Sequence, residues 1–465
     1  MEKVIPLVGY ISSAAILISI LKGKYSNALV WTVFAFCVAG TFQIAPVGNF
    51  GLSFGNAILV SAFTMTILSE LAVRKAILHI FPRGDFRTIS FVALVCLLCV
   101  YLCVGILRGN EFKYILYDLN QWSYFLLSVG LVNFWVLRLD RDEVLRAFDR
   151  ISRAILVANV ILVAVAVGGI LQGHTVVDLG RLDPVALGQA YVHWGDFRPV
   201  RILTGTSYML TVPIFYWATE TLTAASRLRR LRCGFLAALG LILSQVGMNR
   251  STILITVGTI FLWFIHIWMI KRCGRLLRLR IIVSIGIITL LLYVIFAMLG
   301  LSKWFWFYIA YGDKHRFAEA AAVWQILKAS CLLGGGIGQS YTFWDAGRGE
   351  ELVWFIPHLA FMWVPLQLGV SGTIVWWSYW VSGFLRVTKC VRLSQLAGSQ
   401  RESAVFIGML MGLISYLAQS IQSPLIFGAH SFLMQAVIFG LSARFLVLGN
   451  SCVLGGCLKS GSLPS

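Results

Sequence analysis

The chain has 465 residues, of which 59% are hydrophobic and only 12% are charged, yet its formal net charge is +19. Soluble domains typically carry about 25% charged residues. This composition excludes an ordinary soluble protein and predicts a single integral membrane domain over residues 1–465. The basic residues are spread over many short polar segments, which is typical of membrane topology signals and argues against nucleic acid as a partner.

Apolar runs of roughly 20 residues recur along the whole chain, and a run of this length predicts a transmembrane helix. The predicted fold class is an all-α polytopic membrane protein with about 12–13 such helices. The runs lie near 4–21, 27–47, 51–73, 88–107, 114–137, 154–171, 202–222, 233–248, 251–270, 281–301, 358–385, 404–422 and 424–446.

Lys and Arg gather in alternate loops, and the positive-inside rule places these loops in the cytoplasm. The loops between them, near 43–52 and 423, have no basic residue. We therefore expect 172–201 and 302–357 to be periplasmic loops, and the Gly/Ser-rich segment 449–465 to be a disordered cytoplasmic tail. The basic loops lie near 74–87, 138–153, 227–232, 271–280 and 386–401.

The first predicted periplasmic loop, 172–201, ends with Arg198 and Arg201 at the depth of lipid phosphates. Arg198 suits an interfacial anchor as well as a functional role. Arg201 is followed by Thr204-Gly205-Thr206, small residues that let another group approach the backbone. Arg201 is therefore a candidate functional residue.

The second predicted periplasmic loop, 302–357, is a long polar segment between very apolar ones. Hydrocarbon cannot solvate such a loop, so it must lie in water or pack on protein. Residues 313–330 predict a helix along the membrane surface, with Asp313 as its cap and Arg316 in its first turn. Its predicted apolar face contains Phe317, Ala320, Ala321, Trp324, Leu327 and the stem of Lys328.

A glycine cluster follows this helix at Gly334, Gly335, Gly336 and Gly338. Consecutive backbone N–H groups without side chains form an anion-binding nest in some proteins, and in others the same pattern only permits a sharp bend. The sequence leaves both interpretations open.

His358 follows Pro357 at the start of the next apolar run. A histidine in this position is either a hydrogen-bonded interfacial residue or a functional group, since its ordinary pKa lies near neutrality. Gly369 and Gly372 follow at helical spacing and predict a face that packs closely against a neighbour.

Taken in chain order, these motifs resemble the O-antigen polymerase and ligase superfamily, polytopic enzymes of bacterial surface-polysaccharide assembly. Leu359, Gln367 and Asn249 depart from the family pattern, and Leu359 favours the polymerase branch over the ligase branch. The resemblance covers roughly 200–375, through Arg201 to Thr206, Met248-Asn249-Arg250-Ser251, Arg316 to Trp324, Leu332 to Gly338, His358-Leu359 and Gln367 to Gly372.

The resemblance implies a GT-C-like glycosyltransferase that acts on undecaprenyl-diphosphate-linked glycan at the periplasmic face of the bacterial inner membrane. Guanidinium groups stabilise charge on a leaving pyrophosphate through bidentate contacts, which assigns Arg201, Arg250 and Arg316 to pyrophosphate binding. Arg316 and His358 are the predicted catalytic residues, with His358 acting as general base or binding phosphate. No cofactor is expected, and the matched motifs contain no acidic cluster, so we expect a metal-independent reaction.

A polymerase that joins O-antigen or exopolysaccharide repeat units is the preferred activity. Its expected partners are a glycan acceptor, membrane lipids and a chain-length regulator protein. The alternative within the family is a ligase that transfers glycan to lipid A-core or to protein. A transporter or flippase is an alternative hypothesis from another class of protein, and an accessory structural protein is a third hypothesis. The transporter reading rests on polar residues in apolar runs, namely Asp118, Asn120, Gln121, Gln245, His266 and His430.

Overall fold

The computed structural model describes residues 4–39, 43–45, 52–73, 86–171, 189–191, 200–202, 207–246, 316–345, 349–354, 357, 360–420 and 429–459. Predictions that rest on Arg250, Asp313, His358, His266 or the apolar runs between 251 and 301 fall outside these residues. Within them the chain is predominantly helical, as the composition predicts.

A helix overlaps each apolar run in the described part of the chain. A further helix, without a label, covers residues 316–329. The labelled helices are α1 (Val4–Leu21), α2 (Tyr25–Ala39), α3 (Phe54–Val73), α4 (Phe86–Leu107), α5 (Phe112–Val136), α6 (Arg141–Leu171), α8 (Thr211–Thr223), α9 (Arg227–Val246), α13 (Trp363–Leu396), α14 (Gln400–Ser420) and α15 (Ala429–Lys459), with 3-10 turns η2 (Ser207–Leu210) and η3 (Ala360–Met362).

Two stretches in the described part of the chain are long and apolar enough to cross a membrane, by length and composition alone. They are Thr88–Leu107 of α4 and His430–Gly449 of α15. Shorter apolar helices cover Leu7–Leu21, Tyr25–Val38 and Gly55–Ser69.

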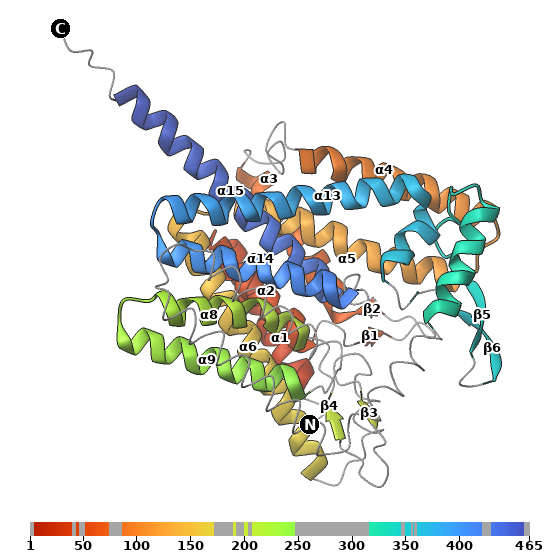
Figure 1. Ribbon diagram of the computed structural model, residues 1–465, viewed down its shortest axis with the longest axis horizontal. Coiled ribbons are helices and arrows are strands. Elements are labelled where there is room, and N and C mark those ends of the chain that lie inside the picture. The colour runs from red at the N-terminus through yellow and green to blue at the C-terminus, as the bar shows by residue number, and fades with distance from the viewer. Residues whose placement is uncertain are drawn as a thin grey trace, which may run out of the picture.

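The long helices form a bundle in which α5 packs against α15, and α13 packs against α4, α14 and α15 (Figure 1). On the other side α2 packs against α1 and α6, and α8 packs against α9 and α14. Short turns make α1 and α2, α8 and α9, and α13 and α14 antiparallel neighbours.

Aromatic rings from α5, α13 and α15 fill the interior. Trp122 stacks on Trp363 with ring centroids 5.0 Å apart and an interplanar angle of 16°. Phe125 lies 5.1 Å from Trp376 and 5.3 Å from Phe432, again between ring centroids. Such pairs contribute about 0.5–1.5 kcal/mol beyond the burial of their area. They fix the position of α13 relative to α5 and α15.

Opposite ends of the bundle differ in chemistry. One end, at the left of Figure 1, contains described turns of the predicted cytoplasmic loops, among them those between α8 and α9 and between α13 and α14, and we call it the basic end. Here Arg141 donates two hydrogen bonds of 2.8 and 2.9 Å to Glu402, which joins α6 to α14. The glycine-loop end, at the right, contains residues 330–340, the turn at 108–111 and the start of α13.

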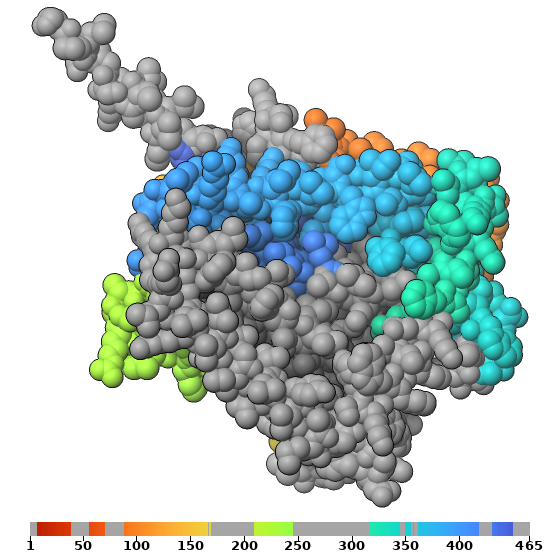
Figure 2. Space-filling model, in the orientation of Figure 1, coloured from red at the N-terminus to blue at the C-terminus, as the bar shows by residue number. Residues whose placement is uncertain are grey.

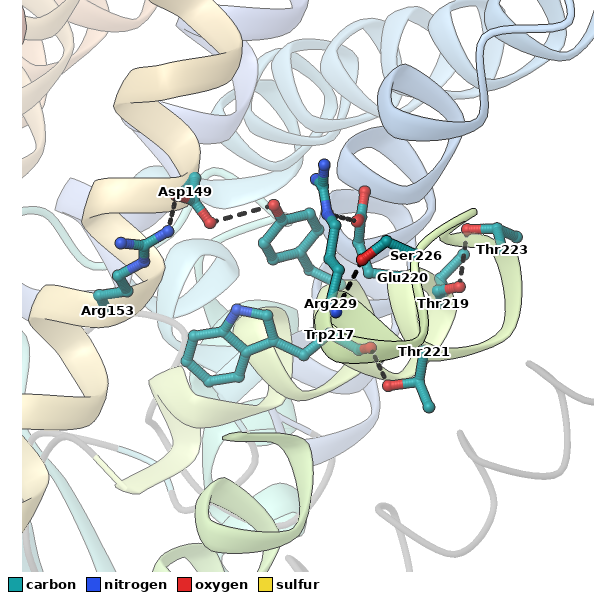
Figure 3. Close-up of polar contacts among 10 residues, drawn as sticks. Asp149, Arg153, Trp217, Thr219, Glu220, Thr221, Thr223, Ser226 and Arg229 are labelled. Atoms are coloured by element: carbon teal, nitrogen blue, oxygen red, sulfur yellow. Dashed lines mark hydrogen bonds and ion pairs between the residues drawn. The ribbon is translucent and has the colours of Figure 1, made fainter. Parts of the chain in front are cut away.

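A second polar cluster at the basic end joins α6, α8 and α9 (Figure 3). The Tyr216 hydroxyl donates to Asp149 at 3.1 Å, and Asp149 also pairs with Arg153. Arg229 pairs with Glu220 at 2.8 Å, and only 3% of the Glu220 side chain is exposed. The basic end is therefore held by charged side chains.

The all-α prediction requires one correction, because three two-stranded antiparallel sheets occur in the described residues. They are β1 (Gln43–Ala45) with β2 (Leu52–Ser53), β3 (Gln189–Tyr191) with β4 (Val200–Ile202), and β5 (Tyr341–Asp345) with β6 (Glu350–Trp354). Along β5, Tyr341 and Phe343 are buried whereas Thr342 and Trp344 are exposed, the two-residue alternation of a strand with one packed face.

α15 continues to Lys459, into the segment 449–465 that the sequence predicts to be a disordered tail. Residues 450–459 extend a long apolar helix, and helix propagation adds one backbone hydrogen bond per residue without a new nucleus.

Candidate active site at the glycine-loop end

The site begins with a break in α13 at Gly369, whose φ is 61° and ψ is −161°. In an unbroken helix the Val370 N–H would donate to the carbonyl of Leu366. Instead it donates to the Leu332 carbonyl at 3.0 Å. The carbonyl groups of Leu366 and Gln367 are thereby left without helical partners.

The glycine loop, residues 334–338, supplies the missing partners. The Gly335 N–H donates to the Leu366 carbonyl at 2.7 Å, and the Gly336 N–H donates to the Gln367 carbonyl at 3.0 Å. Broken helices persist in apolar surroundings when other groups satisfy the freed backbone in this way. The glycine loop and the helix break therefore form one structural unit.

The remaining amides of the loop are also occupied. The Gly334 N–H donates to Ser330 Oγ at 3.2 Å, and the Ile337 N–H donates to the Tyr101 carbonyl at 3.0 Å. The Gly338 N–H donates to Asp118 Oδ2 at 2.8 Å. Of the two interpretations that the sequence leaves open, the bonding pattern favours the bend over a nest for a substrate anion, because every amide from 334 to 338 already has a protein partner. The anion that this loop does bind is the carboxylate of Asp118.

Glycine is required here because other chains pass within contact distance. A Cβ on Gly336, whose φ is +88°, would lie 2.5 Å from the backbone nitrogen of Gly105. A Cβ on Gly338, whose φ is +82°, would lie 2.5 Å from Ile115. The loop is thus wedged between the end of α4 and the start of α5. Close packing at Gly369 is confirmed, but it comes from the break rather than from a smooth helical face.

Asp118 is fully buried and accepts a second hydrogen bond, from Trp363 Nε1 at 3.3 Å. One turn further along α5, Trp122 Nε1 donates to the side chain of Gln367 at 3.0 Å. A buried carboxylate is costly unless hydrogen bonds compensate its lost hydration. These contacts tie the loop and the start of α13 to α5.

The α4–α5 turn closes the outer side of the loop. Arg108 donates to the Gly334 carbonyl at 2.9 Å, and Asn110 donates to the Ile337 carbonyl at 2.9 Å. Hydrogen bonds from a charged donor contribute about 1.5–3 kcal/mol. Both faces of the loop are therefore fixed by groups that lie more than 200 residues away in the sequence.

The helix over 316–329 packs on the protein through one side, which includes Leu327 of the predicted apolar face. Val323 and Leu327 join Tyr341 and Leu366 in a small apolar cluster, and Glu319 is fully buried on the same side. Phe317 and Trp324 of the predicted apolar face are 72% and 46% exposed, so this part of that face does not pack on the described residues. The β5–β6 hairpin covers the Val323 face, and this partner was not evident from the sequence.

The structure locates only part of the predicted site. Arg316 is half-buried in the first described turn of the helix over 316–329. Arg201 lies in β4, paired with Ala190 of β3. Arg250 and His358 lie outside the described residues, although Pro357 is buried and η3 begins at Ala360. Convergence of the four side chains therefore stays a prediction.

Sequence reasoning missed the residues that build the junction. Asp118 was treated as one of several polar residues of a transport path, whereas it binds the glycine loop. His430 is likewise satisfied locally, since its Nε2 lies 2.8 Å from the Phe36 carbonyl. A lone carboxylate within an apolar run was the available signal for Asp118.

Comparison with known proteins adds no family assignment. No protein-family model matches the chain, and no curated protein sequence is significantly similar to it.

Proposed function

We propose that this protein is an integral-membrane glycosyltransferase of the O-antigen polymerase and ligase type. It would transfer an undecaprenyl-diphosphate-linked glycan to a sugar hydroxyl at the outer face of the bacterial cytoplasmic membrane. The glycine-loop junction is the observation that carries the proposal. It joins the segment that bears Arg316 to the start of α13, next to His358 in the chain.

The distribution of charge and exposed apolar surface supports membrane placement. The basic end gathers the turns that the positive-inside rule assigns to the cytoplasm. Along the bundle, outward side chains such as Tyr10 of α1 and Ile89 and Ile106 of α4 are apolar and 60–62% exposed. Lipid is the solvent that suits such a surface. The glycine-loop end then faces the outside.

An apolar groove of about 730 Å³ along α13 suits the polyprenyl tail of such a substrate. It begins at Thr373, whose hydroxyl donates to the Gly369 carbonyl at 2.7 Å, just past the helix break. Ile374 and Leu385, each 61% exposed, line it further along. Figure 2 shows α13 on the surface, continuous with residues 316–345 at one end of the molecule.

The helix over 316–329 suits a position at the membrane interface. Phe317 and Trp324 lie seven residues apart, on one exposed face. The Lys328 ammonium lies 5.6 Å from the Trp324 ring centroid. Exposed aromatic and basic side chains on one helix are typical of the interface between lipid and water. This placement holds Arg316 at the depth of lipid phosphates.

The chemistry follows from these positions. The acceptor hydroxyl attacks the anomeric carbon of the donor sugar, and the bond between that carbon and the diphosphate oxygen breaks. The electron pair leaves with the diphosphate, whose charge the guanidinium of Arg316 stabilises together with those of Arg201 and Arg250. His358 accepts the hydroxyl proton or, in the alternative role, binds phosphate.

Substitution tests the proposal most directly. Arg316→Ala and His358→Ala are expected to abolish glycan transfer without lowering the amount of protein in the membrane. Arg316→Lys is expected to restore the rate only in part, because an ammonium cannot reproduce the bidentate fork. Lys328→Ala is the matched control, a basic residue on the same helix. Full activity of Arg316→Ala would refute the assignment.

Two further measurements separate the remaining alternatives. Deletion of the gene leaves single-repeat surface glycan if the enzyme is a polymerase, and long chains on the lipid carrier if it is a ligase. In a variant whose only cysteine is Cys331, a membrane-impermeant maleimide should label the protein from outside. Labelling only from the cytoplasm would exclude the proposed topology.

A further inference from the structure

A polar pocket of about 440 Å³ lies at the basic end, far from the glycine loop. It forms where the α1–α2 turn meets the α5–α6 turn and the first turns of α6. Its lining residues are Gly23, Lys24, Tyr25, Ser26, Asn27, Arg138, Leu139, Glu143, Arg146 and Arg150. Four cationic side chains thus face one carboxylate.

That carboxylate does not neutralise the cations. The Glu143 side chain accepts the Asp140 N–H at 3.0 Å, and the Asp140 side chain accepts the Glu143 N–H at 2.7 Å. This reciprocal pair is a capping box at the start of α6. Within the described residues, no ion pair joins Glu143 to a basic residue of the pocket.

Two of the cations are held in place by neutral groups. Arg138 donates to the Phe134 carbonyl at 2.8 Å and lies 3.5 Å from the centre of the Phe134 ring. Arg150 donates to Asn27 at 2.9 Å, which joins α6 to the start of α2. Both guanidinium groups are therefore ordered, and in the described part of the chain Arg150 is held by an amide oxygen and not by a carboxylate.

The other two cations, Lys24 and Arg146, are exposed, and no carboxylate pairs with either in the described part of the chain. Arg146 and Arg150 are four residues apart on α6, a spacing at which like charges repel. Arg153, on the same helix, differs from Arg146 and Arg150 in that it forms an ion pair with Asp149. An anion bound in the pocket would offset the repulsion that the protein leaves in place.

We propose that this pocket binds the phosphate of an anionic phospholipid headgroup. Guanidinium and ammonium groups together suit phosphate oxygens, the guanidinium by its fork and the ammonium as a point charge. A lipid is favoured over a soluble phosphate because the pocket adjoins the end of α1, where Ile18 and Leu21 are 50% and 65% exposed. Acyl chains can lie along this flank while the headgroup enters the pocket. The inference rests on the membrane placement proposed above and not on the transferase chemistry.

The test is lipid binding by the purified, detergent-solubilised full chain, which requires no transfer activity. Phosphatidylglycerol should raise the thermal midpoint in a saturable way, and phosphatidylcholine should not. The double variant Lys24→Gln/Arg146→Gln is expected to bind phosphatidylglycerol roughly tenfold more weakly. Arg232→Gln, which removes an exposed cation of α9 outside the pocket, should bind as the wild type does.

Three outcomes would overturn the proposal. The first is a wild type that does not respond to phosphatidylglycerol. The second is an equal loss of binding in Arg232→Gln and in the double variant, which would indicate diffuse surface charge. The third is an effect of inorganic phosphate equal to that of the lipid, which would indicate a soluble ligand. Arg146→Lys is the control for a folding defect. It keeps the positive charge, so it should lose only part of the affinity for phosphatidylglycerol.

Discussion

At the glycine-loop end, backbone groups bond to backbone groups across a helix break, and the carboxylate of Asp118 is buried between two N–H donors. At the basic end, long charged side chains pair near the surface, as Arg141 does with Glu402 and Arg229 with Glu220. The first arrangement depends on close approach and tolerates no added atoms. The second depends on charge, so it tolerates changes in shape but responds to salt.

Among the variants considered, Gly336→Ala, at the glycine-loop end, should lower the free energy of unfolding most. The left-handed backbone and the clash with Gly105 together predict a loss of about 2–5 kcal/mol in the free energy of unfolding. The thermal midpoint in detergent measures this loss. Gly109→Ala is the matched control, since its φ is +75° and no atom lies within 4 Å of the new Cβ. It should cost only about 1–2 kcal/mol, and equal losses would show that close approach is unimportant.

Asp118→Ala should cause the second-largest loss of stability, because it leaves the N–H groups of Gly338 and Trp363 buried without an acceptor. Each such group costs about 1–3 kcal/mol. Asp118→Asn keeps one acceptor oxygen and should lose less. Protease cleavage within 330–340 reports whether the loop has detached. An unchanged midpoint in Asp118→Ala would contradict the role assigned to this carboxylate.

Glu220→Gln should have a smaller effect at the basic end, about 1 kcal/mol, because Arg229 is 45% exposed and water can hydrate it. At higher salt concentration the thermal midpoints of Glu220→Gln and the wild type should lie closer together. The thermal midpoint of Gly336→Ala should lie as far below that of the wild type as it does at low salt. Thermal midpoints at low and high salt give both comparisons. A salt-independent loss in Glu220→Gln would remove the contrast between the two ends.

Tyr341→Phe should have the smallest effect, within about 0.5 kcal/mol at neutral pH. The buried hydroxyl of Tyr341 has no hydrogen-bond partner among the described residues. Burial, and after it the charge of Glu319, raises the pKa of Tyr341 above its ordinary value. The wild type should therefore lose stability above about pH 10, where the unfolded tyrosine ionises, and the variant should lose less. A loss at neutral pH would reveal a partner for the hydroxyl.

The sequence predicted the helices well because each depends on a local run of apolar residues. It predicted the crowding around Gly369, since a glycine at such a position permits close approach. It did not identify which side of the helix over 316–329 packs on the protein, where Glu319 is buried and Phe317 is exposed. The buried face of a surface helix is set by its partner, here the β5–β6 hairpin, and spacing alone cannot identify that partner.

By itself the sequence determined which segments are helical and that Lys and Arg gather in a set of polar segments between them, because composition and periodicity are local properties. Only the tertiary structure decided what the glycine loop binds. A free loop amide is satisfied by whichever acceptor the packed helices bring within reach. Gly334 finds a local acceptor in Ser330. The acceptors of the other four amides are a buried aspartate, the Tyr101 carbonyl and two carbonyl groups beside the helix break, and none of these is near the loop in sequence.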